Sequence, residues 1–242
     1  MTDFQNKLLS VANQNKATEN LIDEKSASLL ERLTFHMLEV NKSLNLTAIK
    51  DEEGVILKHL VDSSACVPYI PENAALCDIG CGGGFPTLVI GVLRGDVSIL
   101  GVDSVTKKVN YVSSTASLLG LDNIRVSNAR AEELGQDKKY REAFDVVTAR
   151  AVGRLNLICE LCLPLVKVGG CFLAMKSLST KEELDEASRA ITLLGGNVEE
   201  IKEYSLTDGK ETVERTIVVI RKVKSTPDKY PRNNSQIAKK PL

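Results

Sequence analysis

The sequence predicts an α/β protein built on an open parallel sheet, with a helical segment in front of it. From residue 75 onwards, short apolar runs alternate with stretches of helical periodicity, which is typical of parallel strands joined by helices. Three consecutive glycines follow the first apolar run, and Pro68 and Pro71 interrupt the chain just before it. We therefore expect a helical extension over residues 1–72 and an α/β domain over residues 73–242, packed as one unit.

The extension shows the spacing of amphipathic helices. In "SASLLERLTFHMLEV", the apolar residues Leu29, Leu33, Met37 and Val40 recur at intervals of three and four. The stretch "GVILKHLVDSSACV" follows at residues 54–67 and predicts a second, shorter helix. The N-terminus lacks the charged-then-apolar pattern of a secretory signal, and no apolar run is long enough to cross a bilayer. We therefore expect a cytoplasmic protein without membrane contact.

The domain is expected to alternate strictly between strands and helices before it closes with an antiparallel pair. Strands are predicted at 75–80, 97–103, 124–129, 144–151 and 171–176, helices at 86–95, 105–121, 131–135, 155–166 and 180–196, and the antiparallel pair at 197–206 and 214–223. Open parallel sheets bind ligands beyond the carboxyl ends of their strands. Residues 78–86, Asp103, Ala131 with Glu132, Arg150 and Lys176 fall at those ends, so we expect them to converge on one crevice.

The glycine-rich stretch "CDIGCGGGFP", residues 77–86, predicts a turn whose backbone approaches a ligand closely. A dinucleotide-binding turn needs the spacing GxGxxG, but alignment on Gly80 and Gly82 puts Phe85 where the third glycine should stand. A P-loop is excluded because no Gly-Lys-Ser/Thr follows. Phe85 therefore disfavours a nicotinamide-dependent oxidoreductase.

S-adenosylmethionine suits the turn better, because this cofactor has no pyrophosphate and carries an ammonium and a sulfonium. Asp78 stands two residues before Gly80, where a carboxylate favours that positive charge directly or through water. Asp103 ends the second strand, in position to accept hydrogen bonds from both ribose hydroxyls. An acid at this place also occurs in nicotinamide enzymes, so Asp78 and Phe85 are the discriminating residues.

Charge and cysteine usage narrow the function further. Residues 215–242 carry eight lysines and arginines against one acid, although the whole chain has a net charge of −1. Such a basic end favours a polyanionic partner, or it is a solvated tail. Cys159 and Cys162 form a CxxC pair in an apolar stretch without a second Cys/His pair, which favours core thiols over a metal site.

The motifs together resemble a known family. "CDIGCGGGFP", "GVDS" followed by two lysines, "NARAEEL", "FDVVTARAV", "PLVKVGG" and the upstream "NLTAI" and "KHLVDS" are similar to those of the small-subunit ribosomal RNA methyltransferase G family, also called glucose-inhibited division protein B. The sequence departs from the family pattern at Cys81 and Gly83, where a serine or alanine and an alanine are usual. Backbone contacts tolerate both changes, while Cys81 raises the question of an oxidation-sensitive loop.

The resemblance implies a class I S-adenosylmethionine-dependent methyltransferase: a Rossmann-like, mostly parallel seven-stranded sheet with an N-terminal helical extension. It implies S-adenosylmethionine as methyl donor and N7 of a guanine in 16S ribosomal RNA as acceptor. It places Gly80 and Phe85 at the cofactor, where we also expect Gly82 of the same turn. It places Ala131 and Glu132 beside the adenine, and Arg150 near both the cofactor's amino-acid end and the target base. A methyltransferase acting on a small molecule or a protein, and a non-catalytic RNA-binding module, are the alternatives.

Methylation at N7 releases no proton from the guanine, so no general acid or base and no metal is expected. Arg150 is expected to orient the substrate or cofactor. The RNA is expected to meet the strand-end cations Arg154 and Lys176 and the basic segment, namely Arg221, Lys222, Arg232, Lys239 and Lys240. The partner would be small-subunit ribosomal RNA or the 30S particle, with no DNA, and the protein would act as a monomer.

Overall fold

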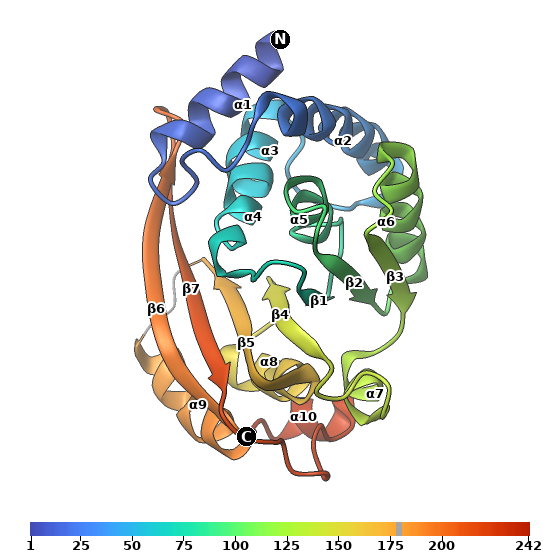
Figure 1. Cartoon of the computed structure of the whole chain (residues 1–242), viewed down its shortest axis with the longest axis vertical. Helices are drawn as coiled ribbons and strands as arrows, with labels where there is room; N and C mark the ends of the chain where they lie inside the picture. Colours follow the sequence, from blue (N-terminus) through green and yellow to red (C-terminus); the bar gives the residue numbers. More distant parts are fainter. Residues whose placement is uncertain (178–180) are drawn as a thin grey trace.

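The computed structural model describes residues 1–177 and 181–242 (Figure 1). Within them, seven strands form one sheet in the order β3-β2-β1-β4-β5-β7-β6. The strands are β1 (Ala75–Ile79), β2 (Ser98–Asp103), β3 (Ile124–Asn128), β4 (Phe144–Arg150), β5 (Val166–Lys176), β6 (Gly196–Thr207) and β7 (Thr212–Lys222). The predicted fold class is confirmed.

Six strands run in the same direction, and β7 alone among the described strands runs against them, because it is antiparallel to both of its neighbours, β5 and β6. β1 pairs in parallel with β2 and β4, β2 with β3, and β4 with β5. β7 is antiparallel to β5, so that Lys176 at the end of β5 faces Thr216, and Cys171 earlier in β5 faces Arg221. The carboxyl ends of β1, β2, β4 and β5 therefore lie at the same side of the sheet, where the parallel strands end. Arg221 lies nearer the opposite side, where these strands begin.

The N-terminal helices begin at polar caps. Thr2, Asp23 and Asp51 each accept a backbone N–H at the start of α1 (Asp3–Gln14), α2 (Glu24–Leu44) and α3 (Glu52–Val55). After α3 the chain continues through a π-helical turn (Ile56–Val61) into α4 (Asp62–Ser64). The predicted short helix is thus real, but it contains a wide turn that its sequence does not announce.

Helices cover both faces of the sheet (Figure 1). On one face, α5 (Thr87–Leu93) and α6 (Thr106–Leu119) share a core with the N-terminal helices, in which Leu33 and Met37 lie among Leu88, Val89 and Val112. On the other lie α7 (Ala131–Gln136), α8 (Leu155–Cys162), α9 (Lys181–Leu193) and α10 (Asn234–Lys239). The extension therefore completes the core of the domain rather than standing apart from it.

Most predicted elements agree with the structure within a few residues. The fifth strand is longer than predicted because Gly169 and Gly170 continue it instead of ending in a turn. The predicted start of the helix at residue 180 lies outside the described residues. None of the described helices is long and apolar enough to cross a membrane.

Candidate functional site

Three adjoining cavities follow the carboxyl edge of the strands, and Val152 lines all of them. The loop cavity, about 390 Å³, is lined by the glycine-rich turn, Asp103 and Arg150. The β2–β3 cavity, about 180 Å³, is lined by Asp103, Ala131 and Glu132. The arginine cavity, about 360 Å³, lies beside Arg150 and Lys176. The strand-end residues predicted to converge thus lie along one crevice, apart from Asp78.

The glycine-rich turn folds over the end of β2. The backbone N–H groups of Gly80 and Cys81 both donate to the carbonyl of Val102, at 2.8 and 3.0 Å. Gly80 has a φ of +72°, and a Cβ there would lie 2.7 Å from Cγ2 of Val152. A side chain at Gly80 would therefore be strained and would collide with the wall that all three cavities share.

Asp78 lies beneath the turn instead of in the crevice. Its carboxylate is buried and accepts hydrogen bonds from the hydroxyls of Thr87, at 2.6 Å, and Thr148, at 2.8 Å. Burial raises the pKa of Asp78 to about 6, although both hydroxyls act in the opposite direction. Of the two expected modes of contact, direct and through water, the burial of Asp78 disfavours the direct one, and the mode through water stays a prediction. In the structure, Asp78 ties β1 to α5 and β4 beneath the loop.

Asp103 lies where the loop cavity and the β2–β3 cavity meet. Its Oδ2 accepts from the N–H of Gly82 at 3.0 Å, and its Oδ1 accepts from the N–H of Val105 at 2.8 Å. The carboxylate is half-buried, so it is fixed in direction and still reachable from both cavities. This arrangement suits an acceptor of two neighbouring hydroxyls.

The β2–β3 cavity also has a wall that comes from the far end of the chain. Ala131 and Glu132, at the start of α7, line it as predicted, and Asn234 of α10 lines it as well. Asn234 was not among the predicted site residues, because no local pattern marks an asparagine that lies about a hundred positions from its neighbours. Lys108, which lines the loop cavity, was not among the predicted site residues either, although it is the second lysine of the motif that begins with "GVDS".

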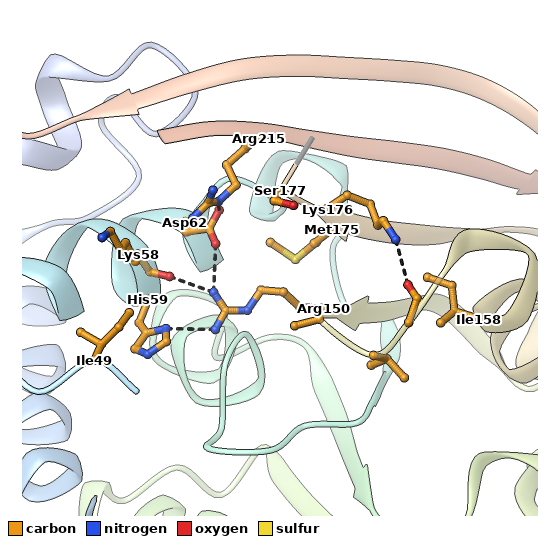
Figure 2. A pocket seen from close by; sticks show the side chains of 13 residues that line it. Ile49, Lys58, His59, Asp62, Arg150, Ile158, Met175, Lys176, Ser177 and Arg215 are labelled. Atoms are coloured by element: carbon orange, nitrogen blue, oxygen red, sulfur yellow. Dashed lines mark hydrogen bonds and ion pairs between the residues drawn. The ribbon is translucent and has the colours of Figure 1, made fainter. Parts of the chain in front are cut away.

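Arg150 lines both the loop cavity and the arginine cavity, and Figure 2 shows its guanidinium directed toward His59 and Asp62. Its Nη1 donates to Oδ2 of Asp62 at 2.9 Å and to the carbonyl of Lys58 at 3.0 Å, and its Nη2 lies 3.1 Å from Nδ1 of His59. Arg215 donates from Nε to the other oxygen of Asp62 at 3.0 Å. None of these partners, Lys58, His59, Asp62 and Arg215, was among the site residues predicted from the sequence.

Two predicted RNA contacts lie beside the crevice and are ion-paired. Lys176 lines the arginine cavity and donates to Glu183 at 2.6 Å and to the carbonyl of Gly153 at 2.8 Å. Arg154 is exposed at the start of α8 and pairs with Glu186 at 2.5 Å. Arg154 can exchange its partner for a phosphate at little cost, since exposed pairs are weak, whereas Lys176 is held more firmly.

The prediction that Lys222 contacts RNA is wrong. The side chain is fully buried, and its ammonium donates to the carbonyls of Leu163 and Val166, to the hydroxyl of Thr226 and to Glu142. Burial lowers its pKa. This lysine holds the basic segment to the body of the protein and offers nothing to a phosphate.

Arg221 and Arg232 also differ from expectation. Arg221 pairs with Glu199 and lies opposite Cys171, away from the strand end where Lys176 borders the crevice. Arg232 donates from both its backbone N–H and its guanidinium to the buried carboxylate of Glu160, at 2.6–2.9 Å. Lys239 and Lys240 are exposed at the end of α10 and fit the prediction best.

The cysteines of the predicted motifs belong to the core. Cys159 and Cys162 are fully buried among the apolar side chains of α8 and the sheet. Cys81 is buried as well, and burial raises the pKa of its thiol, with the charges of Asp78 and Asp103 acting in the same direction. A protonated, covered thiol is a poor target for oxidants.

Comparison with known proteins agrees with this geometry. The sequence profile of the family described as rRNA small subunit methyltransferase G matches residues 26–214. A protein of Lactobacillus johnsonii named ribosomal RNA small subunit methyltransferase G is 44% identical over 210 residues, covering 85% of this chain and 87% of the relative. A protein of the same name from a Geobacillus species is 40% identical over 231 residues, covering 92% and 96%.

Solved structures share the fold at low identity. A SAM-dependent methyltransferase from Aquifex aeolicus superposes with a TM-score of 0.54 at 16% identity, over 73% of this chain and 96% of the other. NSun6 from Pyrococcus horikoshii, solved with SFG, gives 0.52 at 14% identity, over 64% and 50%. The solved structures support the fold alone, whereas the relatives found by sequence support the family that the motifs resemble. The chain therefore belongs to the rRNA small subunit methyltransferase G family.

Proposed function

We propose that this protein transfers a methyl group from S-adenosylmethionine to N7 of a guanine in small-subunit ribosomal RNA. The observation that carries the proposal is that the loop cavity and the arginine cavity meet at Arg150 and Val152. A cofactor in the first cavity and a base in the second would therefore come into contact there. Membership of the family supports ribosomal RNA as substrate, and the motif resemblance supports N7 as the acceptor.

The residues along the crevice fit S-adenosylmethionine. Asp103 would accept from the ribose hydroxyls, since it faces both cavities with its orientation fixed by two backbone N–H groups. Ala131 and Glu132 would border the adenine in the β2–β3 cavity, and the backbone of Gly80 and Gly82 would lie against the methionine part. The absence of a Cβ at Gly80 leaves this approach open.

The arginine cavity suits a purine that has left its helix. Its volume, about 360 Å³, lies in the range of pockets for small ligands, and Ile49 and Met175 supply apolar surface for a ring. Arg150 and Arg215 supply donors beside it. The Hoogsteen edge of guanine presents O6 and N7 as acceptors, so a donor to O6 would leave N7 free for the methyl group.

Methyl transfer to N7 requires that the two reactants be positioned, and it requires no proton transfer. When bound, S-adenosylmethionine supplies an electrophilic methyl group on a sulfonium. N7 of guanine attacks with a lone pair and loses no proton, so Arg150 and its neighbours need only hold the two reactants in line and exclude water. The carboxylate of Asp62 is ion-paired with Arg150 at 2.9 Å, so it is not free to act as a base toward the substrate.

Arg154, Lys239 and Lys240 are the predicted RNA contacts that remain exposed, and Lys108 adds a cation at the loop cavity. Contacts of this kind would hold phosphates without reading sequence. We place the enzyme in the cytoplasm, as a monomer that acts on small-subunit RNA or on the 30S particle, without DNA or membrane contact.

The test is methyl transfer from labelled S-adenosylmethionine to small subunits purified from cells that lack the gene, followed by cleavage at N7-methylguanine. The expected result is one modified guanine. Transfer to another atom of the RNA would overturn the N7 assignment. No transfer to subunits or to their free RNA, with cofactor binding confirmed, would redirect the proposal to a small-molecule or protein substrate.

A further inference from the structure

Arg150, at the junction of the cavities, is held from the N-terminal helices. Lys58, His59 and Asp62, all from the π-helical turn and the residue after it, receive or face its guanidinium (Figure 2). Both acceptors of Nη1, the Lys58 carbonyl and Asp62, lie within 3.0 Å. Because these partners come from one short segment, the guanidinium is fixed by an element that the methyltransferase sheet does not itself contain.

The contact with His59 fixes the protonation state of that histidine. An arginine is always charged and can only donate, so Nδ1 of His59, 3.1 Å from Nη2, must present a lone pair. The ring hydrogen then stays on Nε2, which lies 2.8 Å from the hydroxyl oxygen of Thr47. That hydroxyl also accepts the N–H of Ile49 at 3.1 Å, and this holds it in place.

The surroundings agree with a neutral ring. Burial, together with the charges of Arg150 and Arg215, lowers the pKa of His59 to about 3. The nearest carboxylate, Asp62, has its two oxygens bonded to those same arginines. His59 therefore has no free lone pair with which to accept a proton from a substrate.

His59 also touches the glycine-rich turn. Its ring stacks on Phe85 with centroids 4.4 Å apart and planes 10° from parallel. The guanidinium of Arg150 lies over the same phenyl ring, 5.8 Å from its centroid. One imidazole thus lines both cavities and contacts Phe85 of the loop cavity as well as Arg150, which lines both.

We propose that His59 is a positioning residue: as the neutral tautomer with hydrogen on Nε2, it fixes Arg150 and Phe85 relative to each other where the target base meets the methyl group. The inference rests on the proposed function, because it concerns the geometry of that transfer. Asp62 assists by holding the other side of the guanidinium.

The first test is His59→Phe, which keeps an aromatic ring against Phe85 and removes the acceptor for Arg150. We expect the single-turnover rate of methyl transfer to small subunits to fall by about a hundredfold, the scale expected from misplacing a reacting group by about an ångström. The dissociation constant of S-adenosylmethionine should change by less than about threefold, because Asp103 and the turn are untouched. Thr47→Val should lower the rate in the same direction but less.

The matched control is His36→Phe, at the other histidine of the chain. His36 stacks on Tyr111 with ring centroids 5.8 Å apart, and it lines none of the three cavities. It should keep the rate of the wild type. A His59→Phe protein with the wild-type rate would overturn the proposal. So would a rate loss matched by an equal loss of cofactor affinity, since that indicates a disturbed fold.

A second measurement depends neither on activity nor on the folding of the His59→Phe protein. Wild-type protein is labelled with ¹⁵N-histidine, and the ¹⁵N shifts report which ring nitrogen carries hydrogen. A labelled His36→Gln protein serves only to assign the signals to the two rings. We expect His59 to show a bare Nδ1 and a protonated Nε2 at neutral pH. An imidazolium, or hydrogen on Nδ1, would overturn the inference even if the wild type methylates RNA. A wild type without activity on RNA would instead refute the proposed function.

Discussion

Asp78 shows at the residue scale how a buried carboxylate couples the glycine-rich turn to pH. Its pKa is raised from the ordinary value of 3.8 to about 6 because burial disfavours the charged form. A raised pKa means that the folded protein holds this proton more tightly than the unfolded chain does. The contribution of Asp78 to stability is therefore fully present below about pH 4 and is lost as the pH rises through 6.

We accordingly predict that Asp78→Asn removes this loss. An asparagine can still accept from one threonine hydroxyl, and it carries no charge to bury. Relative to the variant, the wild type should lose up to about 3 kcal/mol of unfolding free energy between about pH 4 and pH 7, as a two-unit shift implies. Denaturant unfolding of both proteins across this range is the measurement, and parallel curves would contradict the prediction.

Lys222 gives a second prediction at this scale. Lys222→Ala should lower the free energy of unfolding by about 3 kcal/mol, because Glu142 and two backbone carbonyls lose a buried partner. Lys224→Ala, at an exposed lysine two positions on, is the control and should change stability by less than about 0.5 kcal/mol. If Lys222→Ala instead keeps its stability and weakens RNA binding, the lysine is a phosphate contact after all.

The residues that sequence reasoning placed correctly are those whose signal is local. Gly80, Gly82 and Asp103 lie at strand ends in a recognisable spacing, so their position followed from the strands. Lys222 was misplaced because counting charges along the chain does not reveal Glu142, eighty positions away, or the carbonyls that surround its ammonium.

At the scale of elements, the helical stretch from Glu52 to Ser64 carries a wide turn where it meets Arg150. Turns of this kind recur at functional sites, because they change the direction in which consecutive side chains point. The apolar pattern of "GVILKHLVDSS" predicted a helix and gave no sign of the turn. His59 was missed as a site residue because its partner stands ninety-one positions further along.

Asn234 of the C-terminal helix α10 lines the β2–β3 cavity, where we propose that the adenine of the cofactor binds. We predict that removing residues 233–242 weakens binding of S-adenosylmethionine by on the order of tenfold, or about 1.4 kcal/mol, because Asn234 leaves the wall of the β2–β3 cavity. Stability should also fall, by about 2 kcal/mol, since Ile237 is fully buried. Calorimetric titration with the cofactor is the measurement.

The control is a full-length protein with Lys239→Ala and Lys240→Ala. It keeps the wall and should bind the cofactor normally while binding RNA less tightly at low salt. Equal cofactor affinity in the truncated and full-length proteins would show that α10 is a covering element without a part in the site.

At the scale of the whole molecule, α1 connects the start of the chain to the β6–β7 hairpin (Figure 1). The side-chain amide of Asn15 donates to the carbonyl of Thr207 at 2.8 Å and accepts its N–H at 2.8 Å. Gln14 donates to the same carbonyl at 2.5 Å. Segments 192 positions apart thus share one set of hydrogen bonds.

We predict that Asn15→Ala destabilises the Thr207 end of the β6–β7 hairpin locally, without destabilising the central strands of the sheet. Backbone amides of residues 205–213 should exchange hydrogen faster, while those of β1 and β4 stay protected, because the latter lie in the central sheet. Hydrogen exchange followed by mass spectrometry measures both. Uniformly faster exchange would mean that the contact supports the whole fold.

The alternation of strands and helices along the chain and the position of the crevice could be predicted from the sequence, because periodicity and glycine placement are short-range signals. The closing contacts could not, because Asn15 with Thr207 and Arg232 with Glu160 each join distant segments through ordinary polar residues. Such pairs leave no periodic trace in a single sequence.

The wall that Asn234 adds to the β2–β3 cavity has a consequence for synthesis. Translation runs from the N-terminus, so the glycine-rich turn and Asp103 emerge more than a hundred residues before α10 does. A nascent chain can therefore form its parallel strands early and still lack this wall of the β2–β3 cavity. Under the proposed function, a chain that ends near residue 230 would compete poorly for the methyl donor.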